Sequence, residues 1–166
     1  MERTTKRGEN DGVEVFSTIM RDGEEKQIIS AVYRYPFQKY VLETTAGLAD
    51  PGETDPRVTA LRELKEETGY TATLEDITHV SPTFTMSPWW STETSVRVDV
   101  RVPDSEANRN PIQELDGEEQ IQVFLLSKRN LFDEVMALAQ EKGFLLDSRL
   151  YQYALGLKEG MAMARS

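Results

Sequence analysis

The chain contains 166 residues, of which 39 % are hydrophobic and 29 % charged, with a formal net charge of −10. This acidic balance argues against a general nucleic-acid binder, which needs clustered Lys and Arg. The lack of cysteine excludes disulfides, cysteine zinc sites and thiol nucleophiles. No apolar run is long enough to span a membrane, and residues 1–12 are polar, without the apolar stretch of a signal peptide. We expect one domain with its own core, in the cytoplasm or, equally compatibly, the nucleus.

The first predicted elements are strands. Residues 13–20 alternate loosely, Asp22 and Gly23 are a hairpin signal, and residues 27–33 form the partner strand. A turn around Pro36 then leads to a short strand over 40–44.

A glycine-containing loop over 47–53 precedes the first predicted helix. Either Thr54 or Asp55 caps this helix, Pro56 occupies its first turn, and Gly69 ends it. Its apolar stripe is predicted at Val58, Leu61 and Leu64.

The second half of the chain predicts more strands and two helices. The strands are expected at 74–80, 94–102 and 120–126, and the helices at 130–142 and 147–159. A loop containing Pro and Trp separates the first two strands, and residues 103–119 are polar, acidic and irregular. Strands mixed with three helices predict an α/β layered domain.

The first helix carries three carboxylates close together, Glu63, Glu66 and Glu67. Side chains three or four positions apart share a helix face, where like charges repel. Hard divalent cations prefer oxygen ligands and would remove this repulsion. The pattern therefore predicts a metal site and phosphate chemistry. An alternative, that these residues are helix formers on a solvated face, explains neither the preceding glycine loop nor the Gly69-Tyr70 end.

The stretch 47–70 resembles the Nudix box, the signature of hydrolases that cleave nucleoside diphosphates linked to another group. The box positions are matched by Gly47, Glu53, Arg62, Glu63, Leu64, Glu66, Glu67, Gly69 and Tyr70. One departure is that eight residues, where the family has seven, separate Glu53 from Arg62. The additional residue falls at the helix start and leaves the register from Arg62 to Glu67 unchanged.

The flanking sequence resembles ADP-sugar pyrophosphatases of the ADP-ribose-hydrolysing type. The matching segments are Arg34-Tyr35-Pro36, Ala46-Gly47-Leu48, Ser81-Pro82 with Met86 and Pro88, Asp116-Gly117-Glu118-Glu119, and 147–158. We expect the additional N-terminal strands that the family exchanges between subunits to be absent here. Pro88 lies further beyond the box than in the family, and Trp89 replaces a frequent glycine. The resemblance implies a single Nudix domain over 1–166, with 1–12 as a residual N-terminal segment, folded as an α/β/α sandwich with a mixed sheet.

The resemblance also implies a set of metal ligands. Glu63 and Glu67 are the leading ligands, Glu66 is close behind, and the Ala46 carbonyl completes the shell around Mg²⁺, with Mn²⁺ as the alternative ion. Arg62 is expected to orient a ligand carboxylate by a bidentate pair, for which Glu53 is the candidate.

Two glutamates are candidates for the general base, which must reach the attacking water. Counting back from Ile121 and Val123 favours Glu119, whereas counting forward from 116–117 favours Glu118.

The residues expected to bind substrate lie outside the box. Arg34 and Arg3 are candidates for holding the ribose-phosphate half, although Arg3 is equally compatible with a surface cation. Glu43 is expected to support a ligand or a ribose hydroxyl. The resemblance adds Leu48, Met86 and Pro88.

Taken with the resemblance, these residues imply metal-dependent hydrolysis of ADP-ribose or a related ADP-sugar to AMP and a sugar phosphate. The partner is then a small nucleotide sugar, a homodimer is compatible, and neither nucleic acid nor membrane is expected. Two alternatives stay open. One is a non-catalytic nucleotide-binding or scaffold protein on the same fold, and the other is a hydrolase for another nucleoside diphosphate derivative.

Overall fold

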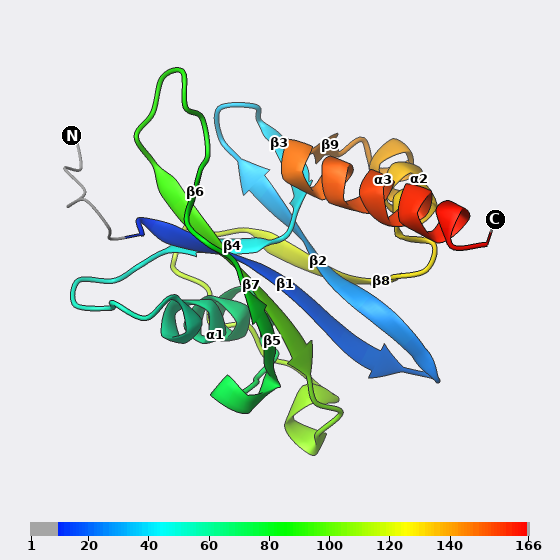
Figure 1. Cartoon of the computed structure of the whole chain (residues 1–166), viewed down its shortest axis with the longest axis horizontal. Coiled ribbons are helices and arrows are strands. Elements are labelled where there is room, and N and C mark those ends of the chain that lie inside the picture. Colours follow the sequence, from blue (N-terminus) through cyan, green and yellow to red (C-terminus); the bar gives the residue numbers. More distant parts are fainter. Residues whose placement is uncertain (1–9, 166) are drawn as a thin grey trace.

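In the computed structural model of the chain, which describes residues 10–165, a nine-stranded mixed sheet lies between helices (Figure 1). The strands are β1 (Gly12–Arg21), β2 (Glu24–Arg34), β3 (Lys39–Glu43), β4 (Thr45–Leu48), β5 (Ile77–Val80), β6 (Phe84–Thr85), β7 (Thr94–Val102), β8 (Ile121–Ser127) and β9 (Leu145–Leu146). The helices are α1 (Pro56–Thr68), α2 (Leu131–Lys142) and α3 (Ser148–Met163), and short 3-10 turns occur at η1 (Leu74–Asp76) and η2 (Glu106–Asn108).

Strand β1 is central to the sheet. The main strand order is β5-β7-β1-β2-β3-β9, with β4 paired to β1, β6 to β7 and β8 to β2. The β1–β7 and β3–β9 pairs are parallel, and the others are antiparallel. Mixed pairing places the start of β1, the strand β4 and the start of β7 side by side.

Two apolar clusters hold helices to opposite faces of this sheet. On one face Ala60 and Leu64 of α1 pack against buried residues of β1 and β7 such as Val15 and Val98. On the other face α2 and α3 cover β2 and β3 through residues such as Leu150. The expected α/β/α sandwich with a mixed sheet is therefore confirmed (Figure 1). None of the described helices is long and apolar enough to cross a membrane.

Several local predictions are confirmed with their physical cause. Asp22 and Gly23 form the two-residue turn of the β1–β2 hairpin, with φ of 51° and 77°. In α1 the Asp55 side chain caps the helix by accepting a hydrogen bond from the Arg57 amide at 3.0 Å. Gly69 ends the helix at φ 76°, and its amide donates to the Lys65 carbonyl at 2.8 Å.

Two predictions about packing and strand length are wrong. Residues 74–76 form a 3-10 turn, so the strand covers only Ile77–Val80, because the Asp76 carboxylate accepts hydrogen bonds from the amide and hydroxyl of Thr73 and favours a turn. Val58 is 46 % exposed. The buried face of α1 instead runs through Ala60 and Leu64, and Glu67 shares it.

The loop predicted over 47–53 begins as a strand. Residues 45–48 form β4, in which Ala46 pairs with Glu14 of β1. Ala46 and Gly47 have low strand propensity, so the strand is recognised only from its pairing with β1. Helix α3 also runs four residues beyond its predicted end at 159, through Gly160 to Met163.

Candidate active site

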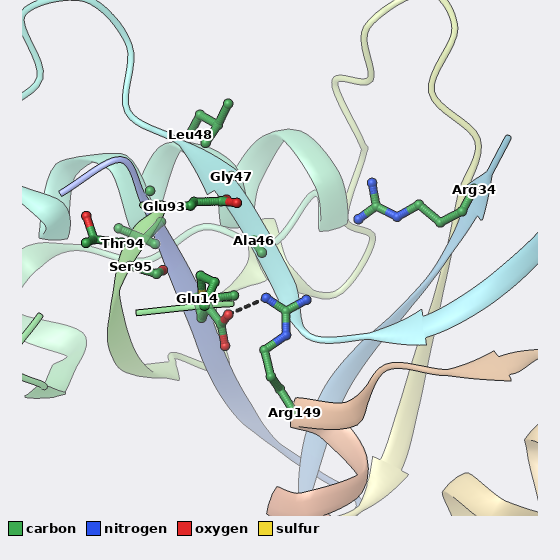
Figure 2. A pocket seen from close by; sticks show the side chains of 12 residues that line it. Glu14, Arg34, Ala46, Gly47, Leu48, Glu93, Thr94, Ser95 and Arg149 are labelled. Carbon is green, nitrogen blue, oxygen red and sulfur yellow. Dashed lines mark hydrogen bonds and ion pairs between the residues drawn. The ribbon is translucent and has the colours of Figure 1, made fainter. Parts of the chain in front are cut away.

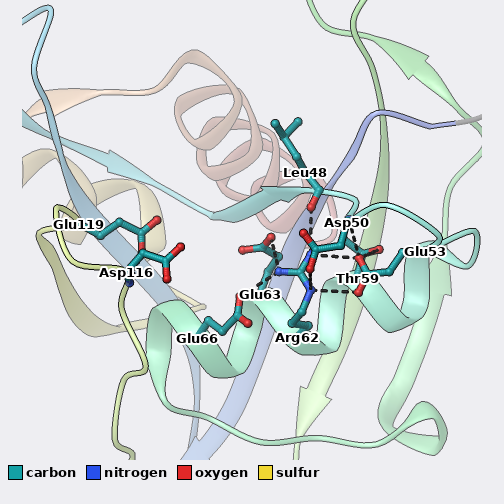
Figure 3. A network of polar contacts seen from close by, with 9 residues as sticks. All are labelled: Leu48, Asp50, Glu53, Thr59, Arg62, Glu63, Glu66, Asp116 and Glu119. Atoms are coloured by element: carbon teal, nitrogen blue, oxygen red, sulfur yellow. Dashed lines mark hydrogen bonds and ion pairs between the residues drawn. The ribbon is translucent and has the colours of Figure 1, made fainter. Parts of the chain in front are cut away.

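Arg62, in the middle of α1, is the centre of a polar network that reaches the preceding loop and β4 (Figure 3). Its Nε and Nη2 donate to the two oxygens of Glu53, each at 3.0 Å. Its Nη1 donates to Glu63 and Glu66, each at 2.9 Å, and Nη2 also donates to the Leu48 carbonyl at 2.9 Å. The expected bidentate Arg62–Glu53 pair is therefore present, and Arg62 also ties β4 to the helix.

Glu53 is a tether for the loop between β4 and α1. Hydrogen bonds from Arg62 lower the pKa of the Glu53 carboxyl to about 2, with help from the Asp50 amide and the Thr59 hydroxyl. Asp55 caps the helix immediately after the tether. The additional residue before Arg62 is thus accommodated at the helix start without separating Glu53 from Arg62.

Glu67 is a buried carboxylate in a field of negative charge. It is 9 % exposed, and its Oε2 has no hydrogen-bond partner among the described residues. Burial raises the pKa of Glu67 to about 8, and the charges of Glu63, Glu119 and Glu43 add to this, against a hydrogen bond from the Ala46 amide. An unpartnered buried carboxylate of this kind needs either a proton or a cation.

Glu63 lies directly against the backbone of β4. A Cβ atom on Gly47 would lie 1.9 Å from Cδ of Glu63, so only glycine leaves room for this carboxylate. Burial raises the pKa of Glu63, although Arg62 opposes the shift. Glu63 and Glu67 therefore occupy the same buried region beside 46–47.

The donor set fits a hard divalent cation. The buried Glu67, with its orphaned oxygen, and the partly buried Glu63 lie beside the backbone of 46–47, which matches the oxygen ligands that Mg²⁺ takes. Within 10–165 no group of three His, Cys, Asp or Glu side chains is already arranged to hold a metal. Arg62 engages Glu63, and it holds Glu66 at the partly exposed edge of this region.

The two candidate bases differ in their relation to this region. The charge of Glu119 raises the pKa of both Glu63 and Glu67, so its carboxylate lies close to them. Figure 3 shows Glu119 and Asp116 on the loop facing α1, where the Asp116 amide donates to Glu119 Oε2 at 3.0 Å. Glu118 enters neither of these interactions. The geometry favours Glu119.

A cavity of about 280 Å³ is lined in part by Ala46 and Gly47 (Figure 2). It is lined by Gly12, Val13, Glu14, Arg34, Ala46, Gly47, Leu48, Met86, Glu93, Thr94, Ser95 and Arg149. Of the expected substrate residues, Arg34, Leu48 and Met86 line it, whereas Pro88 does not. Arg3 lies outside the described residues.

Arg34 is held in position by a buried partner. Its Nε and Nη2 donate to the two oxygens of Glu43 at 2.7 and 2.5 Å. Glu43 is buried, while the Arg34 side chain is half-exposed toward the cavity. Such a bidentate pair fixes the guanidinium and leaves its remaining N–H groups for an anion. Glu43 thus acts through Arg34 and does not itself line the cavity.

Sequence reasoning missed a second arginine on the cavity wall. Arg149, on the first turn of α3, donates from Nε and Nη2 to Asp147 at 2.8 and 2.7 Å and from Nη1 to Glu14. Glu14 and Arg149 are 135 positions apart, so no local pattern could connect them. The one available signal was the Asp-x-Arg cap, which also occurs at Asp55 and Arg57.

The chain is similar to known proteins over most of its length. The NUDIX domain model matches residues 13–143. An uncharacterized Nudix hydrolase of Schizosaccharomyces pombe is 35 % identical over 164 residues, covering 96 % of this chain and 77 % of that protein. The ADP-sugar pyrophosphatase of Mus musculus is 34 % identical, covering 93 % and 71 %. The ADP-ribose pyrophosphatase of Saccharomyces cerevisiae is also 34 % identical, covering 93 % and 67 %.

The fold has counterparts among solved structures. A crystal structure of an ADP compounds hydrolase matches with a TM-score of 0.57 at 23 % identity, covering 96 % of this chain and 77 % of that one. Similarity at this level of identity concerns the fold alone.

Proposed function

This chain belongs to the Nudix family, and from that premise we propose that it hydrolyses the pyrophosphate bond of ADP-ribose or a related ADP-sugar, releasing AMP and a sugar phosphate. Nudix proteins typically use a divalent metal. Glu63 and Glu67 would hold Mg²⁺, or Mn²⁺ in its place, with Glu66 and the Ala46 carbonyl as further ligands. A bound ion of this kind neutralises pyrophosphate oxygens and lowers the pKa of bound water.

The single observation that carries this proposal is the state of Glu67. Because of its orphaned Oε2, its burial and the surrounding carboxylates, Glu67 can carry its negative charge at neutral pH only beside a cation, and without one it holds a proton. A purely structural role would favour an apolar or neutral residue at this position, because an unpaired buried charge destabilises a fold.

The remaining roles belong to side chains of the chain itself. Arg34, fixed by Glu43, binds a phosphate oxygen and neutralises part of the substrate charge. Glu119 accepts the proton of the attacking water, with Glu118 as the rival for this role. Arg62 is a positioning residue, because it holds the β4–α1 loop and Glu63 rather than facing the cavity.

The choice of an ADP-sugar rests on three supports. The segments outside the box resemble ADP-ribose-hydrolysing pyrophosphatases, and the mouse and yeast relatives carry the names ADP-sugar and ADP-ribose pyrophosphatase. In addition, a cavity is lined by Ala46 and Gly47, the residues against which Glu67 and Glu63 lie. A single domain over the whole chain, a homodimer and a cytoplasmic location remain predictions.

A panel of pyrophosphate compounds tests the proposal. The protein with Mg²⁺ is incubated with ADP-ribose, ADP-glucose, UDP-glucose, diadenosine tetraphosphate and 8-oxo-dGDP, and nucleotide products are separated by chromatography. We expect the highest kcat/KM on an ADP-sugar, with AMP and sugar phosphate formed in equal amounts.

Other outcomes of the panel select the alternatives. Preferential cleavage of 8-oxo-dGDP or of a nucleotide without an ADP moiety would assign another nucleoside diphosphate derivative. Tight calorimetric binding of ADP-ribose with no AMP at any Mg²⁺ or Mn²⁺ concentration would indicate a binding protein and would contradict hydrolysis.

A further inference from the structure

We infer that Glu14 and Arg149 form a subsite for the hydroxyl groups of the sugar attached to the second phosphate of the substrate. The inference deepens the proposed function and rests on it. It concerns a part of the cavity wall that the metal-holding carboxylates and Arg34 do not occupy. Figure 2 shows the Glu14–Arg149 pair beside Ala46, separated from Arg34.

The pair is rigidly held and turned toward the cavity. Glu14 is 3 % exposed on β1, and its Oε1 accepts a hydrogen bond from Arg149 Nη1. Asp147 binds the Nε–Nη2 edge of the same guanidinium. Each Nη carries a further N–H beyond these bonds. Both Glu14 and Arg149 line the cavity, so donors and an acceptor carboxylate face the same space.

The charge of this subsite suits a neutral hydroxyl-bearing group better than a phosphate. One guanidinium is shared between two carboxylates, Glu14 and Asp147, and Glu93 adds a third carboxylate to the cavity wall. Excess negative charge repels a phosphate. Sugar hydroxyls, in contrast, both donate to carboxylates and accept from guanidinium N–H groups.

Arg34 is the better partner for the phosphate. It is paired one-to-one with Glu43, and it lies close enough to Glu67 for the charge of Glu67 to act on it. Arg149 is also within electrostatic range of Arg34. Arg34 therefore lies near both Glu67 and the proposed sugar subsite, as expected for a residue that binds the diphosphate.

The lining of the cavity favours a sugar over a nucleobase. The described lining residues include no aromatic side chain on which a base could stack. They provide instead carboxylates, guanidinium groups, hydroxyls and backbone. The cavity volume of about 280 Å³ is close to the lower limit of the volumes usual for ligand pockets, about 300 Å³. A cavity of this size is consistent with a small polar ring.

Helix capping alone does not explain Arg149. The same Asp-x-Arg arrangement caps α1, where Arg57 donates from Nε and Nη2 to Asp55 at 3.0 and 2.7 Å. Arg57 is half-exposed, makes no further ion pair among the described residues and lies away from the cavity. Arg149 differs in reaching the buried Glu14. The α1 cap is therefore a matched control for the α3 cap.

Steady-state kinetics on two probes test the inference. ADP-ribose and the β-methyl ester of ADP share the diphosphate, but the ester lacks the terminal sugar. We expect Arg149→Gln and Glu14→Gln to lower kcat/KM on ADP-ribose by about tenfold to a hundredfold, mainly through KM, as for loss of hydrogen bonds to charged groups. Both variants should leave kcat/KM on the methyl ester unchanged, and Arg57→Gln should leave both probes unchanged.

The contrary outcomes are distinct. Equal losses of kcat/KM on both probes would show that the pair acts on the diphosphate or on the fold. No loss of kcat/KM on either probe would show that the pair contacts no sugar. Each of these results overturns the inference. If the wild type cleaves neither probe, the proposed function fails. The same comparison is then made with dissociation constants from calorimetry, and an unchanged ratio of the two constants overturns the sugar subsite.

Discussion

Glu67 is the residue at which burial and ionisation conflict most strongly. Its pKa is raised to about 8 by burial and neighbouring carboxylates, so the metal-free folded protein holds a proton there up to neutral pH. In the unfolded chain the same group titrates near its ordinary value of 4.5. The native state therefore binds one more proton than the unfolded state between these two values, and stability falls as the pH rises through this window.

The metal-free wild type and Glu67→Gln should differ in this dependence on pH. Because glutamine cannot ionise, the variant should gain stability relative to wild type as the pH rises from 5 to 9, by the order of a few kcal/mol at the upper end. Urea unfolding in the presence of a chelator at pH 5, 7 and 9 measures the difference. A difference that does not change with pH would show that Glu67 titrates normally in the folded protein.

Glu118 and Glu119 provide a matched pair for locating the base. Both are on the same loop, and Glu119 is among the main charges that raise the pKa values of Glu63 and Glu67, whereas Glu118 is not. Glu119→Gln should lower kcat by about 10² to 10⁴, the usual contribution of a general base, while Glu118→Gln should leave kcat near wild type. Kinetics on the best substrate of the panel decide between them. Loss confined to Glu118→Gln would reverse the assignment.

At the scale of elements, the contact between β4 and α1 sets the position of the carboxylates. Gly47 leaves space for Glu63, and Arg62 joins the Leu48 carbonyl to the helix. Strand β4 itself is fixed by its pairing with β1. The glycine of the box is therefore explained by close approach of a side chain to the backbone and not by a turn.

Gly47→Ala should separate these two elements locally. Its Cβ would overlap the Glu63 carboxyl, and displacement of a reacting group by about 1 Å is worth about a hundredfold in rate. Activity should fall accordingly while the far-ultraviolet circular dichroism is retained. Gly160→Ala is the control, because nothing lies within 4 Å of its Cβ in α3 and alanine favours the helix. Full activity in Gly47→Ala would remove Glu63 from its proposed role.

An element can be predicted from the sequence when the residues that determine it are local, and not when it depends on tertiary contacts. Strand β7 is predictable from its alternation of apolar and polar residues. Helix α1 is predictable from the cap residue Asp55, the first-turn Pro56 and the terminal Gly69. Strand β4 was missed since its pairing with β1 is a tertiary interaction. The turn at 74–76 was missed because the Thr73–Asp76 hydrogen bonds outweigh the strand pattern.

At the scale of the whole molecule, the site lies where the sheet, α1 and α3 meet. The carboxylates of α1 lie against the Ala46-Gly47 backbone, and the same backbone lines the cavity with Arg34 and Arg149. Motifs within one segment predicted the first half of this arrangement. The Glu14–Arg149 pair could not be predicted, because it exists only once β1 and α3 are packed in the same domain.

The most direct test of the central claim compares AMP release from ADP-ribose by the wild type, Glu67→Gln and Glu75→Gln at saturating Mg²⁺. Glu75 is an exposed glutamate in η1 and provides the matched control. Wild type and Glu75→Gln should release AMP at the same rate. Glu67→Gln should lower this rate by at least about a hundredfold, because mutation of residues that only orient metal ligands already costs up to that much. Wild-type turnover in a folded Glu67→Gln protein would contradict the assignment of metal-dependent pyrophosphate hydrolysis to this helix.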